Sequence, residues 1–176
     1  MDTGLVHIYT GEGKGKTTAA VGLSVRCAGA GGRVIFSQFM KGGDTFELMP
    51  LSDIPGVTVL RSSKDFPFFK NMNDSEKSEL TLIHNRILGR IIADVKACAV
   101  DLVVLDELTY AYNYDLCDKE LLRSLLELSK GKVEIVITGR NADPFLVDRA
   151  DYITEMKAVK HPLKDQGIAA RKGIEY

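Results

Sequence analysis

The chain has 176 residues and a formal net charge of −1, with 45% hydrophobic and 27% charged residues, which fits one globular domain and gives no electrostatic attraction to nucleic acid or anionic membranes. No apolar run approaches the length that crosses a bilayer, and residues 1–4 lack the basic flank of a signal peptide. We therefore expect a cytoplasmic protein with no nucleic-acid or membrane partner.

A glycine-rich loop follows the first predicted strand, residues 5–9, and precedes a helix expected over residues 19–26. Glycines let the backbone N–H groups approach an anion, and the start of the helix favours phosphate at the same place. Lys16 adds a charge for phosphate oxygens, and the hydroxyl of Thr17 is placed to join a magnesium shell. The predicted nucleotide-binding residues are Thr10, Gly11, Glu12, Gly13, Lys14, Gly15, Lys16, Thr17 and Thr18.

One position of this loop departs from the usual phosphate-loop pattern. The pattern has a glycine five residues before its last glycine, and here Thr10 holds that position. The departure allows the nucleotide to lie differently from the nucleotide of a motor ATPase. A glycine-rich turn that binds nothing is the alternative, and the complete Gly15-Lys16-Thr17 ending argues against it.

The next two predicted strands cover residues 33–39 and 56–61, and a polar loop over residues 40–44 follows the first of them. Loops at the carboxyl ends of strands bind the ligands of open α/β sheets. After the second strand, the irregular segment 62–73 has three phenylalanines, Phe66, Phe68 and Phe69. They form either a small cluster that packs back on the core or an apolar wall for a large flat ligand.

A helix predicted over residues 74–99 leads to an apolar strand, residues 101–105, which ends in Asp106 and Glu107. A carboxylate at this edge can hold magnesium opposite Thr17, so Asp106 is the candidate ligand. Glu107 would polarise a water molecule or also serve the metal. The alternative for this acidic pair is a solvated loop or a helix cap.

Arg140 follows another predicted strand and is therefore expected at the same sheet edge. There its guanidinium would brace phosphate oxygens or form a surface salt bridge. The remaining predicted elements are a helix capped by Asp118, a strand over residues 132–138, a short helix over 144–149 and a strand over 152–156. The alternation of strands and helices predicts an α/β fold with a doubly wound, mostly parallel sheet and helices on both faces. Together with the glycine-rich loop, this arrangement resembles the P-loop NTPase fold of the RecA-like type.

The cysteines and histidines share no metal-ligand spacing, so we assign none of them to a metal. The odd number of cysteines suits a reducing compartment, and we expect them to be small buried hydrophobic residues. These residues are Cys27, Cys98, Cys117, His7, His84 and His161.

Several segments, in order over nearly the whole chain, together resemble the P-loop type of ATP:corrinoid adenosyltransferase. The matching segments are residues 9–20, 38–42, 103–110, 138–142, 154–157, 159–162 and 172–176. The resemblance implies alkyl transfer: a reduced corrinoid, with cobalt in the +1 state, attacks the 5′-carbon of ATP and expels triphosphate. In this family the nucleotide lies with reversed polarity, which accords with Thr10.

The resemblance also implies catalytic roles for Lys16, Thr17 and Arg140 at the triphosphate. In this family a phenylalanine and a tryptophan together displace the axial base of the corrinoid. Phe66 matches the phenylalanine, and Phe68 occupies the position of the tryptophan. This chain has no tryptophan, so Phe68 departs from that pattern. The rival interpretations are a P-loop ATPase or kinase that makes ADP, and an ATP-gated binding module without turnover.

Some relatives cover the active site with an amino-terminal extension, whereas four residues precede the first predicted strand here. We expect the tail, residues 158–176, to lie over the site of the single domain 1–176, with a solvated surface strap as the alternative. The resemblance further implies a homodimer and a flavoprotein that supplies electrons.

Overall fold

A computed structural model describes residues 3–40 and 45–175 of the chain. Of the polar loop expected over residues 40–44, only Met40 therefore lies within the described residues. No helix in these two ranges is long and apolar enough to cross a bilayer.

A six-stranded sheet with the strand order β3-β2-β4-β5-β1-β6 forms the centre of the fold. The strands are β1 Val6–Thr10, β2 Val34–Gln38, β3 Val57–Arg61, β4 Leu102–Asp106, β5 Glu134–Thr138 and β6 Tyr152–Glu155. They lie within two residues of the six predicted strands, and every pair of neighbours is parallel. The register sets Gln38 opposite Asp106 and Thr10 opposite Glu155, so the carboxyl ends of the strands meet at one edge.

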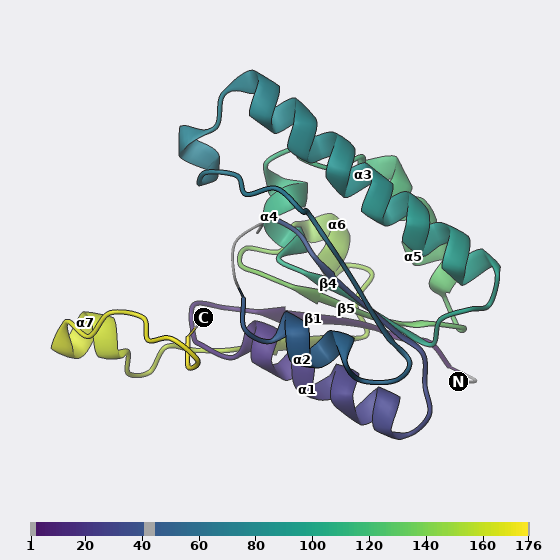
Figure 1. Cartoon of the computed structure of the whole chain (residues 1–176), viewed down its shortest axis with the longest axis horizontal. Helices are drawn as coiled ribbons and strands as arrows, with labels where there is room; N and C mark the ends of the chain where they lie inside the picture. Colours follow the sequence, from purple (N-terminus) through teal and green to yellow (C-terminus); the bar gives the residue numbers. More distant parts are fainter. Residues whose placement is uncertain (1–2, 41–44, 176) are drawn as a thin grey trace.

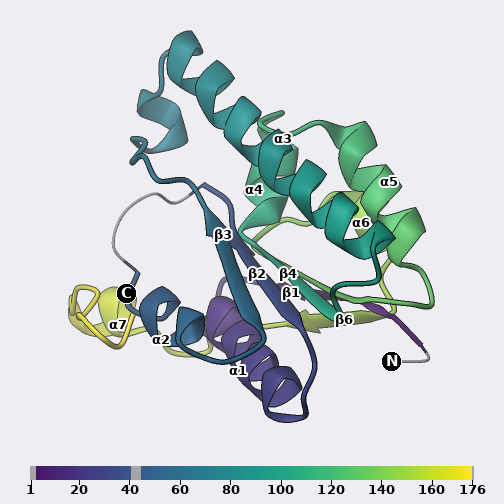
Figure 2. The same cartoon turned by 45° about the vertical axis from the view of Figure 1, so that its right-hand side comes forward.

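Helices cover both faces of the sheet, as the alternating sequence predicts. In Figures 1 and 2, α3 and α5 lie over one face, and α1 and α2 lie over the other. The helices are α1 Lys16–Gly29, α2 Leu48–Ser52, α3 Asp74–Lys96, α4 Leu108–Asn113, α5 Lys119–Ser129, α6 Pro144–Val147 and α7 Pro162–Gln166, with a 3₁₀ turn η1 at Phe69–Asn71. The fold is thus a doubly wound α/β sheet.

The two faces of the sheet belong to separate apolar clusters because successive side chains of a strand point to opposite sides. Ile35 and Val103 face the cluster that includes α3 and α5. Phe36, Val104 and Val136 face the cluster that includes α1 and α2. Strands β2 and β4 are buried along their whole length, which explains the apolar runs at residues 34–36 and 102–105.

The helix ends show where local sequence signals are strong. Helix α3 begins after Asn73, whose side chain accepts a hydrogen bond from Glu76 N, while Asn73 N donates one to the carboxylate of Glu76. This reciprocal cap explains the predicted start at residue 74. The predicted end at residue 99 is three residues too late. The sequence interpretation also missed α2, α4 and α7, which have only five or six residues each.

All three cysteines are free thiols. Cys27 and Cys117 are buried, as expected, whereas the prediction of burial is wrong for Cys98, which is exposed. Cys98 follows the end of α3 with a φ of 52°, in a turn at the surface of the molecule.

Candidate active site

The glycine-rich loop runs from the end of β1 at Thr10 to the start of α1 at Lys16. Lys16, Thr17 and Thr18 therefore lie in the first turn of α1, three residues earlier than the predicted helix start. Gly15 is the N-cap residue with a φ of 118°, a conformation that favours glycine. The loop thus directs the start of α1 toward the edge where the strands end (Figure 1).

The backbone of Met156, just after β6, packs directly against this loop. The N–H of Gly13 donates a 2.6 Å hydrogen bond to Met156 O, and Met156 N donates to Thr10 O. A Cβ atom at Gly11 or Gly13 would lie within 2.7 Å of Met156 O. Glycine is therefore required at both positions for close packing.

Lys16 turns back over the loop. Its Nζ donates hydrogen bonds of 2.7 Å to Gly11 O and 2.8 Å to Gly13 O. Burial, and then the positive charge of Arg140, lowers the pKa of Lys16 from its ordinary value. The ammonium group is thus held at the loop by neutral carbonyl groups.

Asp106 lies at the end of β4 and is completely buried. Its Oδ1 accepts hydrogen bonds from the hydroxyl of Thr17, at 2.8 Å, and from the hydroxyl of Thr138, at 2.7 Å. The next residue, Glu107, has a φ of 59°, and its N–H donates to Thr138 Oγ1. The structure therefore brings Thr17 and Asp106 together, as the sequence predicts, and adds Thr138.

Arg140 lies two residues beyond the end of β5, in the position expected from the sequence. Its Nε lies 3.0 Å from Oε2 of Glu12 in the glycine-rich loop, and its Nη1 donates to the hydroxyl of Tyr110 at 3.3 Å. The preceding residue must be glycine, because a Cβ atom on Gly139 would lie 1.9 Å from Thr109 Oγ1. This close approach of α4 fixes the path of the backbone between the end of β5 and Arg140.

Two cavities open at this edge of the sheet. The first, of about 660 Å³, lies between the glycine-rich loop and the tail. The second, of about 1130 Å³, lies beside the aromatic segment. The residues that line both cavities are Thr17, Thr18, Glu107, Tyr110, Arg140, Ile174 and Glu175.

The three phenylalanines of segment 62–73 all line the second cavity. Phe66 and Phe69 also pack against the core, and the ring of Phe69 stacks on Tyr114 with the centroids 4.1 Å apart. Phe68 has a different environment, because 87% of its surface is exposed. Two of the rings therefore anchor the segment to the core, and all three line the cavity.

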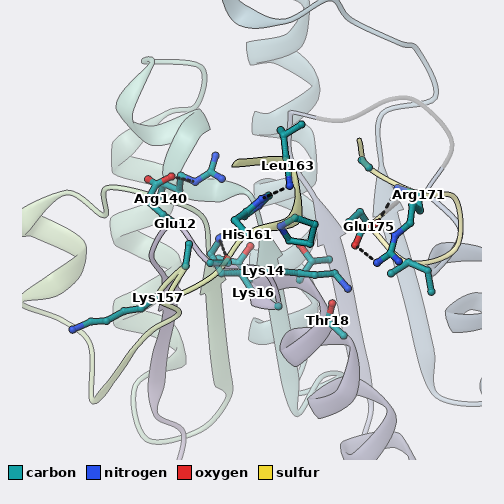
Figure 3. A pocket seen from close by; sticks show the side chains of 18 of the residues that line it. Glu12, Lys14, Lys16, Thr18, Arg140, Lys157, His161, Leu163, Arg171 and Glu175 are labelled. Carbon is teal, nitrogen blue, oxygen red and sulfur yellow. Dashed lines mark hydrogen bonds and ion pairs between the residues drawn. The ribbon is translucent and has the colours of Figure 1, made fainter. Parts of the chain in front are cut away.

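The tail, residues 158–175 of those described, lies beside the glycine-rich loop (Figure 1), where it contributes basic side chains to the first cavity. Figure 3 shows Glu12 on one side of the site and Arg171 on the other, with His161, Lys14 and Lys16 between them. Lys172 lies over the ring of Phe46, with 4.8 Å between Nζ and the centroid. This contact joins the tail to the second cavity.

No group of three or more His, Cys, Asp or Glu side chains that could hold a metal ion occurs in residues 3–40 and 45–175. His84 is a buried core histidine whose Nδ1 donates to Leu116 O and whose Nε2 accepts from Met40 N. Burial lowers the pKa of His84 to about 4.

Comparison with known proteins identifies the family. Residues 2–176 match the family described as ATP:corrinoid adenosyltransferase BtuR/CobO/CobP. The corrinoid adenosyltransferase CobA of Salmonella typhimurium is 34% identical, over 99% of this chain and 87% of the relative. Corrinoid adenosyltransferases of Escherichia coli and Pseudomonas aeruginosa are 32% and 30% identical, over 99% of this chain and 87% and 85% of their own lengths. The chain belongs to the ATP:corrinoid adenosyltransferase family.

Membership of the adenosyltransferase family favours the transferase interpretation over the P-loop ATPase or kinase. Sequence reasoning missed Thr138 and Tyr110 as parts of the site. Thr138 ends β5 next to β4, so knowledge of the strand order would have placed it beside Asp106. Tyr110 lies on α4, a helix too short to predict, and its residue type carries no signal for this position.

Proposed function

We propose that this protein transfers the 5′-deoxyadenosyl group of ATP to the cobalt of a reduced corrinoid and releases triphosphate, in the synthesis or salvage of adenosylcobalamin. The observation that carries the proposal is the shared wall of the two cavities, which includes Thr17, Glu107 and Arg140. Phosphoryl transfer to water needs only the first cavity. Alkyl transfer needs a second, larger cavity beside the first, because a corrinoid must bring its cobalt to the nucleotide.

The proposed reaction requires the protein to stabilise the leaving triphosphate and to hold the reacting atoms in line. The electron pair of cobalt in the +1 state forms a bond to the 5′-carbon, and the bond between this carbon and the triphosphate oxygen breaks with its electrons on oxygen. Lys16, Arg140 and the loop N–H groups would stabilise the charge on the departing triphosphate. The adjoining cavities would hold the cobalt and the carbon in line, a matter of positioning.

We propose that magnesium bound to ATP is held by Thr17 and Asp106, with Glu107 beside them. The hydroxyl and the buried carboxylate already meet at 2.8 Å and offer the oxygen atoms that magnesium prefers. Magnesium commonly takes one or two carboxylates plus substrate phosphates, so a cluster of several acidic side chains is not required. When bound, the ion would supply positive charge next to the leaving triphosphate.

Phe66 and Phe68 are the proposed contacts to the lower face of the corrinoid. Both line the second cavity, and the high exposure of Phe68 leaves its ring available to a flat ligand. Crowding by these rings would displace the axial base and make reduction of the cobalt easier. A phenylalanine at position 68 would do this with less surface than a tryptophan.

The tail, residues 158–176, is proposed to cover the site and complete a single domain, 1–176. Its support is the lining of both cavities by Ile174 and Glu175 and the contact of Lys172 with Phe46. A homodimer, a flavoprotein electron donor and a cytoplasmic location complete the proposal and rest on the family resemblance. Sedimentation at several protein concentrations tests the dimer.

The reaction is tested by mixing the protein with ATP, magnesium and chemically reduced cobalamin. We expect the cobalt +1 absorbance to disappear while triphosphate and a light-sensitive alkylcobalamin form in equal amounts. ADP and phosphate, with no change in the corrinoid, would contradict the proposal and favour an ATPase.

A further inference from the structure

Glu12 places a negative charge inside a loop that would otherwise bind an anion. Its neighbours in the loop include Lys14 and Lys16, and its side chain lines the first cavity. An acidic side chain in this position repels phosphate, so its presence calls for a physical explanation.

The structure pairs this carboxylate with Arg140, which follows β5 and lines the same cavity. Oε2 of Glu12 lies 3.0 Å from Nε of Arg140, and the two side chains point toward each other in Figure 3. The same guanidinium donates to Tyr110, which lies on α4. Arg140 is therefore held by one protein carboxylate and one hydroxyl at the edge of the cavity where a triphosphate would bind.

The pair is exposed enough to exchange partners. The side chains of Glu12 and Arg140 are 62% and 43% exposed, and ion pairs with this exposure are weak. A triphosphate offers several pairs of charged oxygens that a planar guanidinium can bind with two parallel hydrogen bonds. It would therefore compete well with a single carboxylate for Arg140.

We propose that Glu12 competes with triphosphate for Arg140 and so sets how tightly the first cavity holds triphosphate groups. This inference rests on the proposed function only in taking triphosphate as the ligand and product. Weakening the hold on a highly charged product helps it leave, since triphosphate gains a formal negative charge on the oxygen that is released from the 5′-carbon. Return of Arg140 to Glu12 then accompanies release.

The first test measures binding of tripolyphosphate in the presence of magnesium, by calorimetry and without a corrinoid. We expect Glu12→Gln to bind tripolyphosphate roughly fivefold more tightly than the unmodified protein, and more so at low salt. The matched control is Glu127→Gln, which removes the same charge from an exposed position on α5, over the face of the sheet opposite α1. Unchanged or weaker binding by Glu12→Gln would overturn the inference.

A double-mutant cycle separates competition for Arg140 from simple repulsion. If Glu12 acts through Arg140, the gain from Glu12→Gln should fall below roughly twofold in a protein that also carries Arg140→Ala. An equal gain with and without the arginine would contradict the exchange. In steady-state turnover, Glu12→Gln should also be inhibited by lower concentrations of tripolyphosphate.

The two proposals fail in different ways. Binding of tripolyphosphate with the expected response to Glu12→Gln, but no alkylation of cobalamin, would leave this inference standing and reject the proposed function. Alkylation of cobalamin with no effect of Glu12→Gln on tripolyphosphate binding would support the proposed function and reject this inference. Absence of tripolyphosphate binding by the unmodified protein would overturn this inference.

Discussion

The hydroxyl of Thr17 donates a hydrogen bond of 2.8 Å to Oδ1 of Asp106, which is 89 residues away in the sequence. This bond joins the first turn of α1 to the end of β4 and sets a hydroxyl beside a buried carboxylate. Thr138, at the end of β5, donates to the same oxygen. Three elements therefore converge on one carboxylate at the edge where the cavities open.

Two substitutions at Thr17 test whether this hydroxyl serves the metal. Thr17→Val keeps the shape and removes the hydroxyl, and we expect it to lower kcat/KM for ATP roughly a hundredfold. Thr17→Ser keeps the hydroxyl and should retain most of the activity. Initial rates are measured over a range of magnesium concentrations. Equal activity of the valine and serine variants would exclude the hydroxyl from the site.

Lys16→Ala should abolish productive binding of ATP while the fold is retained. The hydrogen bonds of Lys16 go to two carbonyl groups of the surface loop, so their loss leaves the core intact. Calorimetry with ATP gives the affinity, and thermal unfolding followed by circular dichroism checks the fold. Unchanged turnover would remove the glycine-rich loop from the active site.

Substitutions of Phe68 test the displacement of the axial base. Phe68→Ala should slow transfer roughly tenfold when the corrinoid is supplied with cobalt in the +2 state. It should change the rate little when the corrinoid is already reduced. Phe68→Trp adds ring surface and should speed the reaction from the +2 state. Equal losses from both starting states in Phe68→Ala would argue against this role of Phe68.

A charge in the tail should weaken binding of both substrates if the tail covers the site. Ile174 lines both cavities, so Ile174→Asp should raise KM several-fold for ATP and for the corrinoid. Val159→Asp is the control, because Val159 is 88% exposed and lines neither cavity. If the two variants behave alike, the tail is a solvated strap.

The buried His84 should make the fold sensitive to mild acid. Because burial lowers its pKa to about 4 from an ordinary value of 6.5, the unfolded chain binds a proton there that the folded chain does not. The contribution of this pKa shift to the free energy of unfolding is thus fully present above pH 6.5. It is lost progressively as the pH falls toward 4, by about 3 kcal/mol in total.

Chemical unfolding at several pH values measures this effect. His84→Gln cannot titrate and should be less stable at pH 7 but show a flatter pH dependence between 6.5 and 4.5. The control is His161→Gln, which changes a histidine of the tail. Its free energy of unfolding should vary with pH as steeply as that of the unmodified protein. An unchanged slope in His84→Gln would mean that another group causes the acid sensitivity.

The sequence predicted the interior strands well because parallel interior strands are buried on both faces and read as short apolar runs, as in residues 102–105. It predicted the long helix α3 because seven of its side chains are buried at helical spacing. The short helices α2, α4 and α7 were missed. Five or six residues are too few to show a helical period, and tertiary contacts decide their conformation.

Pairs of residues in the site were predictable where a motif carries them. The phosphate-loop pattern and the acidic strand end predicted that Thr17 and Asp106 would lie near each other. The contact between Glu12 and Arg140 depends on the strand order, which places β5 next to β1. The close packing of Met156 on the glycine-rich loop likewise depends on β6 pairing with the far side of β1. Neither pairing has a local signal in the sequence.

The most direct test of the central claim uses ATP labelled with ¹³C at the 5′-carbon and chemically reduced cobalamin. Nuclear magnetic resonance then follows the labelled carbon, and phosphorus spectra identify the inorganic product. We predict that the label moves into the corrinoid as a carbon bonded to cobalt, while the three phosphates leave joined as triphosphate. A label that stays in ADP or AMP, with the corrinoid unchanged, would contradict the account.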